Sequence, residues 1–396
     1  MNYRKLSSIL ARATTAGSNL CGAARPGASA AAAAAAAAEC RSYFTSTSQR
    51  GKSLYSKLSA LGDPKITLVP ELDSWVETRK KVSVAELQRI IHDLRKRRRF
   101  SQALQVSQWM NEKGICIFST AEHAVQLDLI GKVHGFEAAE SYFSKLNDEH
   151  KTAKTYGALL NCYVRQNQAD KAVAHFQKME EMGFASPLAY NSIMRLYNNL
   201  EQHDKVPDVF RDMKRKNVSP DNYSYRICLT SYGEKEDIGG MEQVLEEMEG
   251  QEHIVMDWSS YVVVANFYIK AKQTEKAIEA LQKAEQKLSL GEGDGVGYNH
   301  LISLYSKIGK KSKVLRLWNL EKKACKRYLN RDYLNMLEAL VRLGAIEEAE
   351  KVLKDWEASG NCYDPRLPQV VIDGYSAKGL LDKAKSLQED QQKKGN

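Results

Sequence analysis

The residues with the clearest chemical potential in this sequence are basic side chains that recur about every 35 residues. This basic row consists of Lys96, Lys132, Arg165, Lys270, Lys307 and Arg342. A row with roughly one positive charge per repeating unit suits contact with a phosphate backbone. Asn199 and Glu234 interrupt the row where two further basic residues would fall. The alternative is that Lys and Arg simply favour the last turn of a helix, where they offset the helix dipole.

A second basic feature is an unbroken run of five residues near the start of the row. This basic run is Arg95, Lys96, Arg97, Arg98 and Arg99. It would suit a phosphate-binding patch or a contact with ribosomal RNA. The alternative is a solvated turn, which is what such a run most often is.

Motifs for catalysis and metal binding are absent from the sequence. The glycine-rich stretch 291–297 does not follow a strand pattern, so it is interpreted as a flexible link and not as a phosphate loop. There is no His-Glu-x-x-His motif, and the clustered aspartates of a metal-dependent nuclease are missing. The seven cysteines include no Cys-x-x-Cys pair, which indicates reduced thiols and no zinc site. We therefore expect no enzymatic activity, no metal or other cofactor and no small-molecule substrate.

The elements that would position the basic row are clearest in the stretch from Pro187 to Asp221. Its two halves space their apolar residues at three and four positions, as helices do. These residues are Tyr190, Ile193, Met194 and Tyr197 in the first half, and Val206, Phe210 and Met213 in the second. Pro220 ends the second helix because a proline disfavours helical geometry in the residue before it. Such a hairpin cannot bury its apolar stripes alone, so it needs copies of itself on either side.

Copies of this hairpin follow one another from residue 84 to the end of the chain. A tyrosine marks the fourth place of six units: Tyr156, Tyr190, Tyr225, Tyr261, Tyr298 and Tyr333. A small residue marks the twentieth place: Ala103, Ala139, Ala172, Ala277, Ala349 and Ala384. Glycines mark turns at Gly309, Gly344 and Gly379 and helix ends at Gly114 and Gly360. The predicted units are 84–119, 120–152, 153–186, 187–221, 222–257, 258–294, 295–329, 330–364 and 365–396. A period near 35 with two helices per unit predicts an all-α solenoid, and the basic row occupies its thirteenth place.

The segments AYNSIMRLY, GYNHLISLY and TYGALLNCY resemble the pentatricopeptide repeat over roughly residues 84–396. A tetratricopeptide unit would instead show a tryptophan and a Leu-Gly pair in its first helix. No tail with His-x-Glu and Cys-x-x-Cys follows, so the chain resembles the plain P-type class. The block LQRIIHDLRKRRRFSQALQVSQWM resembles a plant mitochondrial subgroup of that family. The resemblance implies a right-handed α-solenoid superhelix of about nine helix-turn-helix units.

The resemblance also implies that single-stranded RNA is bound with one base per repeat. In the family, the fifth and last residues of each unit read the base, and we call these the reading places. Asn191 with Asp221 matches the family's uridine-preferring pair, and Asn299 is a suitable fifth residue in a unit that ends in Leu329. Three aspartates are suitable last residues with unsuitable fifth residues: Asp257 with Arg226, Asp294 with Val262, and Asp364 with Leu334.

The fifth residues of the remaining units are not typical base readers: Gln88, Ala124, Gly157 and Gln369. A good bidentate pair is worth about 1–3 kcal/mol, so one well-formed pair cannot select a transcript from a pool. Two functions stay open. The first is a non-catalytic, single-stranded RNA-binding protein in mitochondrial transcript processing, stability or translation. The alternative is a structural or accessory protein of the mitochondrial ribosome, which would use the helical repeats as a protein-docking scaffold.

The first 50 residues differ in composition from the rest of the chain. They hold six basic residues and one acidic residue, so they account for +5 of the formal net charge of +9 and leave +4 for the remainder. They are also rich in Ser, Thr and Ala, with alanines from Ala30 to Ala38. This composition predicts a disordered organellar presequence with a processing site near Arg41, and the mitochondrial matrix as destination. The alternatives are a low-complexity tail or a chloroplast destination.

The two ends of the repeat array carry weaker signals. Residues 51–83 are expected to form a linker and a capping helix that includes Leu72, Trp75 and Val76. The polar tail LQEDQQKKGN predicts that the second helix of the last unit frays. No stretch of eighteen apolar residues without charges occurs, so no membrane insertion is expected.

Overall fold

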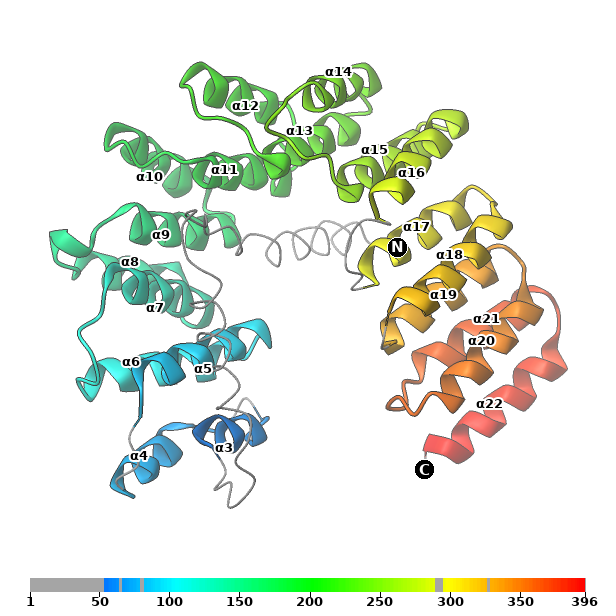
Figure 1. Ribbon diagram of the computed structural model, residues 1–396, viewed down its shortest axis with the longest axis horizontal. Coiled ribbons are helices and arrows are strands. Elements are labelled where there is room, and N and C mark those ends of the chain that lie inside the picture. Colours follow the sequence, from blue (N-terminus) through cyan, green and yellow to red (C-terminus); the bar gives the residue numbers. More distant parts are fainter. Residues whose placement is uncertain (1–52, 64–65, 79–81, 289–294, 326–327, 396) are drawn as a thin grey trace, which may run out of the picture. The chain divides into compact units, whose positions relative to one another are not determined.

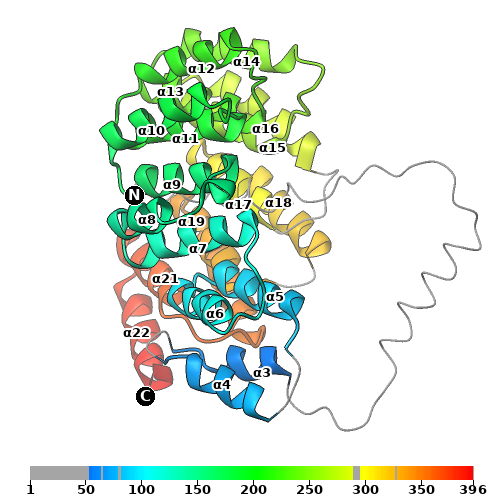
Figure 2. The same ribbon diagram turned by 90° about the vertical axis from the view of Figure 1, so that its left-hand side faces the viewer.

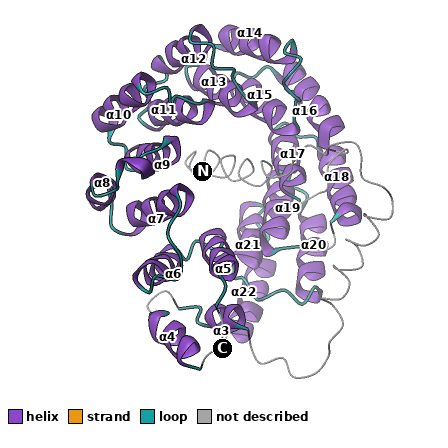
Figure 3. Cartoon of the chain, turned by 60° about the vertical axis from the view of Figure 1, so that its left-hand side comes forward, coloured by secondary structure: helices purple, strands orange, loops and turns teal. Residues whose placement is uncertain are grey.

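The computed structural model describes residues 53–63, 66–78, 82–288, 295–325 and 328–395, in which all regular structure is helical (Figure 3). This confirms the predicted all-α repeat fold. The chain divides into two compact bodies, an N-terminal body up to Leu200 and a C-terminal body from Glu201. The predicted presequence and Asp294 lie outside the described residues, so the structure does not bear on them.

The N-terminal body contains two short leading helices, three complete hairpins and the first helix of a fourth (Figure 1). The leading helices α3 and α4 lie beside α5 and α6 (Figure 2), so two helices occupy the region where the sequence predicted one. The helices are α3 (Leu54–Ala60), α4 (Val69–Glu77), α5 (Val84–Lys96), α6 (Phe100–Glu112), α7 (Thr120–Val133), α8 (Phe136–Ser144), a 3₁₀ turn (Asp148–His150), α9 (Ala153–Arg165), α10 (Ala169–Glu181) and α11 (Pro187–Asn199).

The C-terminal body begins with α12 and continues with five hairpins. Its helices are α12 (Lys205–Arg215), α13 (Asn222–Glu234), α14 (Ile238–Glu249), α15 (Trp258–Lys270), α16 (Thr274–Leu288), α17 (Val296–Lys307), α18 (Lys311–Ala324), α19 (Asn330–Arg342), α20 (Ile346–Ala358), α21 (Arg366–Ala377) and α22 (Leu381–Gly395). In this body the first helices of successive repeats, α13, α15, α17, α19 and α21, pack against one another in chain order. Residues at one place of the repeat therefore line up along the stack.

The core of each body is built from the places that the sequence pattern singled out. Five of the fourth-place tyrosines are at most 5% exposed, and the twentieth-place alanines are at most 6% exposed. Burying a large apolar side chain contributes about 1.5–3 kcal/mol, which a single hairpin could not obtain without its neighbours. The turn glycines Gly309, Gly344 and Gly379 adopt positive φ angles, as the sequence predicted.

In the first eight repeats the residue at the twenty-seventh place, on the second helix or just after it, is buried, and one of these eight residues is charged in type where the others are apolar. Seven described members are apolar: Met110, Leu146, Met179, Met213, Met248, Ala284 and Trp356. The eighth is Glu321 on α18, which is fully buried. A carboxyl group therefore occupies a core position between the repeats of α18 and α19.

The last residue of most units is also the N-cap of the next first helix. This holds for Ser119, Thr152, Ser186, Asp221, Asp257 and Leu329. Ser, Thr and Asp are favoured there because a side-chain oxygen can accept an otherwise unpaired helical N–H. The preference for aspartate at the last place thus has a folding cause that is independent of any ligand.

Candidate nucleic-acid interface

In the N-terminal body, three cations from consecutive repeats converge on one carboxylate. Asp128 of α7 lies 2.6 Å from Lys132, 3.1 Å from Arg95 and 3.3 Å from Arg165. Burial alone would raise the pKa of Asp128, but Lys132, Arg165 and Arg95 together hold it below its ordinary value. With three positive charges against one negative charge, this cluster remains positive.

Within the C-terminal body, members of the basic row lie on the three consecutive first helices α15, α17 and α19. Lys270 pairs with Glu234 at 3.0 Å. Lys307 donates to Oδ1 of Asn266 at 3.2 Å, and Arg342 donates to the hydroxyl of Ser306 at 2.7 Å. The last two contacts are to neutral groups, so they leave the positive charges uncompensated. Burial first, and then repulsion from Arg342 and Lys270, lowers the pKa of Lys307.

The basic run at the end of α5 divides into exposed and internally bound residues. Lys96, Arg97 and Arg98 are exposed, and Arg97 donates to the Tyr55 hydroxyl at 3.0 Å. Arg99 instead turns toward the end of α3, where its guanidinium donates to the carbonyl oxygens of Ser59 and Leu61. Arg99 therefore fastens the leading helix α3, a role that the run of charges in the sequence did not reveal.

The reading places Asn191 and Asp221 belong to different bodies. Asn191 lies on α11 and is 2% exposed. Asp221 is the exposed N-cap of α13, and its Oδ1 accepts the backbone N–H of Ser224 at 2.7 Å and the Ser224 hydroxyl at 2.9 Å. Asp221 thus has a capping function in the C-terminal body.

Four other polar reading places in the C-terminal body are bound to groups of the protein itself. Arg226 and Asp257, the fifth and last residues of one repeat, form an ion pair of 2.6 Å. Asn299 donates to Asp332 at 2.7 Å. Asp364 accepts Nε of Arg366 at 2.9 Å. Sequence reasoning treated Arg226 only as an unsuitable reader, although its charge is opposite to that of Asp257.

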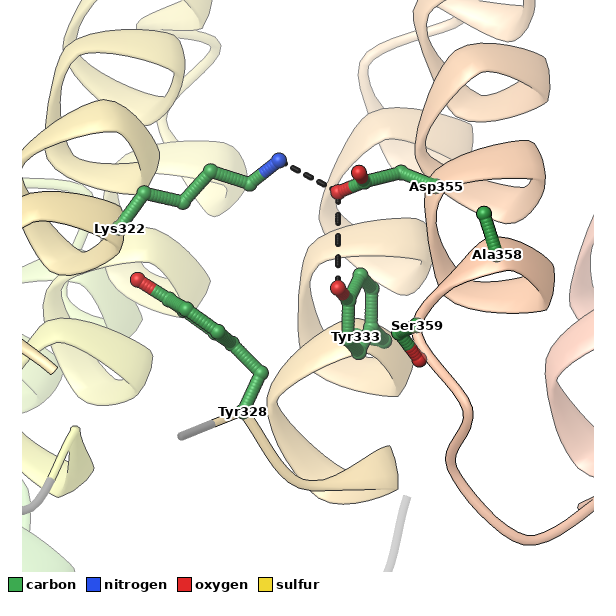
Figure 4. A pocket seen from close by; sticks show the side chains of 6 residues that line it. All are labelled: Lys322, Tyr328, Tyr333, Asp355, Ala358 and Ser359. Atoms are coloured by element: carbon green, nitrogen blue, oxygen red, sulfur yellow. Dashed lines mark hydrogen bonds and ion pairs between the residues drawn. The ribbon is translucent and has the colours of Figure 1, made fainter. Parts of the chain in front are cut away.

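A small open pocket of about 330 Å³ lies among α18, α19 and α20 (Figure 4). Lys322 and Asp355 form an ion pair at this pocket, and the hydroxyl of Tyr333 donates to Asp355 at 3.5 Å. Tyr328 lies beside them. The same pattern of opposite charges on consecutive second helices recurs as Lys214 with Glu247 and as Glu249 with Lys283, each at 2.9 Å. The pocket is therefore one example of a recurrent contact between repeats, and sequence reasoning missed this pattern.

Two further properties concern the part of the chain that the structure describes. No group of three or more His, Cys, Asp or Glu side chains is arranged there to hold a metal ion. None of its helices combines the length and the apolar character needed to cross a bilayer.

Comparisons with known proteins match this repeat organisation. The profile of the PPR repeat family matches residues 185–234. The profile of the PPR repeat matches residues 154–184, 296–320, 332–361 and 369–395. The crystal structure of the pentatricopeptide repeat protein PPR10 in complex with an 18-nt psaJ RNA element is similar in fold, with a TM-score of 0.61 and 19% identity over 91% of this chain. The alignment covers 52% of PPR10, so this chain spans about half its length.

Two curated relatives from Arabidopsis thaliana are closer in sequence. Both are named as mitochondrial pentatricopeptide repeat-containing proteins. One is 54% identical over 356 residues, which is 90% of this chain and 72% of the relative. The other is 38% identical over 85% of this chain and 68% of the relative. Because of this sequence identity and coverage, and because both bodies consist of helical repeats, the chain belongs to the pentatricopeptide repeat family.

Proposed function

We propose that this protein binds single-stranded RNA in plant mitochondria and acts there without catalysis in transcript processing, stability or translation. The mitochondrial relatives support the compartment, and the composition of residues 1–50 agrees with it. The RNA that PPR10 holds in its complex supports the class of ligand. The absence of catalytic motifs from the sequence supports a binding function.

The observation that carries this proposal is the basic row on α15, α17 and α19. Its three cations are contributed by consecutive repeats; Lys270 pairs with the carboxylate of Glu234, whereas Lys307 and Arg342 donate to the neutral side chains of Asn266 and Ser306. Phosphates bound along this row would relieve the repulsion that lowers the pKa of Lys307. A flexible polyanion with regularly spaced charges satisfies this arrangement better than a compact ligand does.

The test is the salt dependence of RNA binding by the purified full chain. The affinity for a fluorescent 20-nucleotide single-stranded RNA is measured by anisotropy from low to moderate salt. Replacing Lys270, Lys307 and Arg342 together by alanine should reduce the slope of log K against log salt by about 2, since each lost phosphate contact removes about 0.7. The matched control replaces Lys323, Lys351 and Lys354, three exposed lysines of the second helices α18 and α20. Equal slopes for both triple variants, or no RNA binding at low salt, would overturn the proposal.

A ribosomal location is the second candidate, and the exposed part of the basic run favours it. Lys96, Arg97 and Arg98 present three cations at one helix turn, which suits the clustered phosphates of folded RNA better than an extended strand. Sedimentation of an organelle lysate separates the two candidates. Co-migration with a ribosomal subunit that survives mild RNase and is lost when these three residues become alanine would support the ribosomal location. Release by RNase, with messenger fragments recovered, would support the first proposal.

A further inference from the structure

The repeat 222–257 has its two reading places bound to each other. Nη1 of Arg226, the fifth residue, lies 2.6 Å from Oδ2 of Asp257, the last residue. The same nitrogen donates to the Ser259 hydroxyl at 2.9 Å. The Arg226 side chain is only 8% exposed, so the guanidinium is enclosed by its partners.

Both ends of this pair are held in place by the fold. Oδ1 of Asp257 caps α15 by accepting the backbone N–H of Ser260 at 3.0 Å, and it also accepts the Ser259 hydroxyl at 2.9 Å. This leaves Oδ2 directed to the guanidinium. The Tyr223 ring lies 5.7 Å from the guanidinium carbon and covers it from another side. Moving Arg226 away would leave the enclosed guanidinium without its charge partner, so the closed arrangement is favoured.

We propose that this repeat is closed to nucleobases. The guanidinium of Arg226 donates to Asp257 the hydrogen bond that a neighbouring amide or a base edge would otherwise donate. It also fills the space beside the Asp257 carboxylate. RNA that extends from the basic row on α15, α17 and α19 over α13 would therefore leave its base at this repeat unread. This inference rests on the proposed RNA-binding function.

Two later repeats of the C-terminal body show that such occupation is not confined to one place. The amide of Asn299 is engaged by Asp332, and the carboxylate of Asp364 is engaged by Arg366. The pair in repeat 222–257 differs from these because its fifth and last residues close on each other. Replacing Arg226 alone therefore leaves Oδ2 of Asp257 without its guanidinium donor, while Oδ1 still caps α15.

The test is selection from a pool of randomised 20-nucleotide RNAs with the immobilised full chain. Three variants are compared with the wild type: Arg226→Asn, which opens the repeat; Arg226→Lys, which keeps a cation beside Asp257; and Arg211→Asn, which removes an arginine of α12 that is 73% exposed. The Arg226→Asn pool should gain a preference of about tenfold for one base at one additional position, the size expected of a good bidentate contact. The pools of Arg226→Lys and Arg211→Asn should match the wild type.

Three results would overturn the inference. One is a base preference in the wild-type pool that Arg226→Asn loses, because Arg226 would then be a reader itself. Another is an Arg226→Asn pool that binds RNA but gains no preference. The third is that no protein, including the wild type, enriches any RNA; this result would overturn the proposed function as well as this inference. Circular dichroism melting checks each variant, and Arg226→Gln replaces Arg226→Asn if the latter does not unfold cooperatively.

Discussion

The side-chain amide of Asn299 on α17 donates to Oδ1 of Asp332 on α19 at 2.7 Å, and this contact joins two consecutive repeats. The second oxygen of Asp332 accepts the backbone N–H of Leu329 at 2.9 Å. Leu329 stands at the N-cap, where its own side chain has no oxygen to offer. One nearly buried carboxylate therefore connects the repeats and also satisfies the start of α19.

Replacing Asp332 by alanine should destabilise the protein by about 1–3 kcal/mol, because the nearly buried carboxylate loses its hydrogen bonds with Asn299 and Leu329 and its ion pair with Arg331. Asn299→Ala should cost less, about 1 kcal/mol, because Asp332 keeps its contact with Leu329. Urea unfolding monitored by circular dichroism measures both. Asp208→Ala, at an exposed carboxylate of α12, is the control and should change the free energy of unfolding by less than about 0.5 kcal/mol. Equal effects of the three substitutions would contradict the dual role of Asp332.

The buried carboxyl of Glu321 should make stability depend on pH. Burial, reinforced by the nearby Asp332, raises the pKa of Glu321 to about 8. In the unfolded chain the same group titrates near its ordinary value of about 4.3. Between these two values the folded protein keeps the proton that the unfolded chain releases. Stability should therefore fall by up to about 1.4 kcal/mol per pH unit as the pH rises through this window, and then level off above it.

Glu321→Gln removes the titrating proton and keeps the shape of the side chain. Urea unfolding of the wild type and of this variant at pH 6, 7 and 8.5 should show the variant gaining stability relative to the wild type at each step. Glu321→Met, which restores the residue type found in four other repeats, should behave in the same way. A difference between wild type and variants that stays constant from pH 6 to 8.5 would show that Glu321 is ionised in the folded protein.

The Asp128 cluster should respond to pH in the opposite direction. The pKa of Asp128 is lowered in the folded protein, so its contribution is present above the unfolded pKa and is lost as the pH falls through the lower folded pKa. Asp128→Asn should cost about 1–3 kcal/mol at pH 7, less than for a fully buried pair because Arg95 and Arg165 are about one-third exposed. The difference in free energy of unfolding between this variant and the wild type should shrink below about pH 4. Thermal unfolding at pH 7 and pH 3.5 measures this, and an unchanged difference would contradict it.

Two glycines should differ in their response to alanine. A Cβ at Gly233 of α13 would overlap the Phe267 ring of α15, so Gly233→Ala should cost about 1–3 kcal/mol through crowding. Gly309 has a φ of +73° with open space around its Cα, so Gly309→Ala should cost about 1 kcal/mol from backbone strain alone. Gly309→Asn should recover part of that loss, because asparagine tolerates this backbone region. Denaturant midpoints rank the variants, and the reverse order would refute the crowding argument.

Local patterns in the chain were sufficient to predict the repeat architecture. The three- and four-residue spacing of apolar side chains, the fourth-place tyrosines and the turn glycines such as Gly309 follow from the geometry of one helix or one turn. The predicted unit starts match the helix starts at Val84, Thr120 and Asn330. Helices α17 and α21 begin one residue after the predicted starts, because Gly295 and Pro365 stand at their N-caps.

The contacts between repeats could be identified only from the tertiary structure. The partners in three such contacts are each more than 30 residues apart: Arg226 and Asp257, the Arg99 side chain and the Leu61 carbonyl, and Asn299 and Asp332. Nothing local distinguishes these polar side chains from exposed ones. Their side-chain directions are set by the packing of one repeat on the next, which no single helix encodes. The repeat period could thus be derived from the order of residues, whereas the occupation of its reading places was decided by the packing of neighbouring helices.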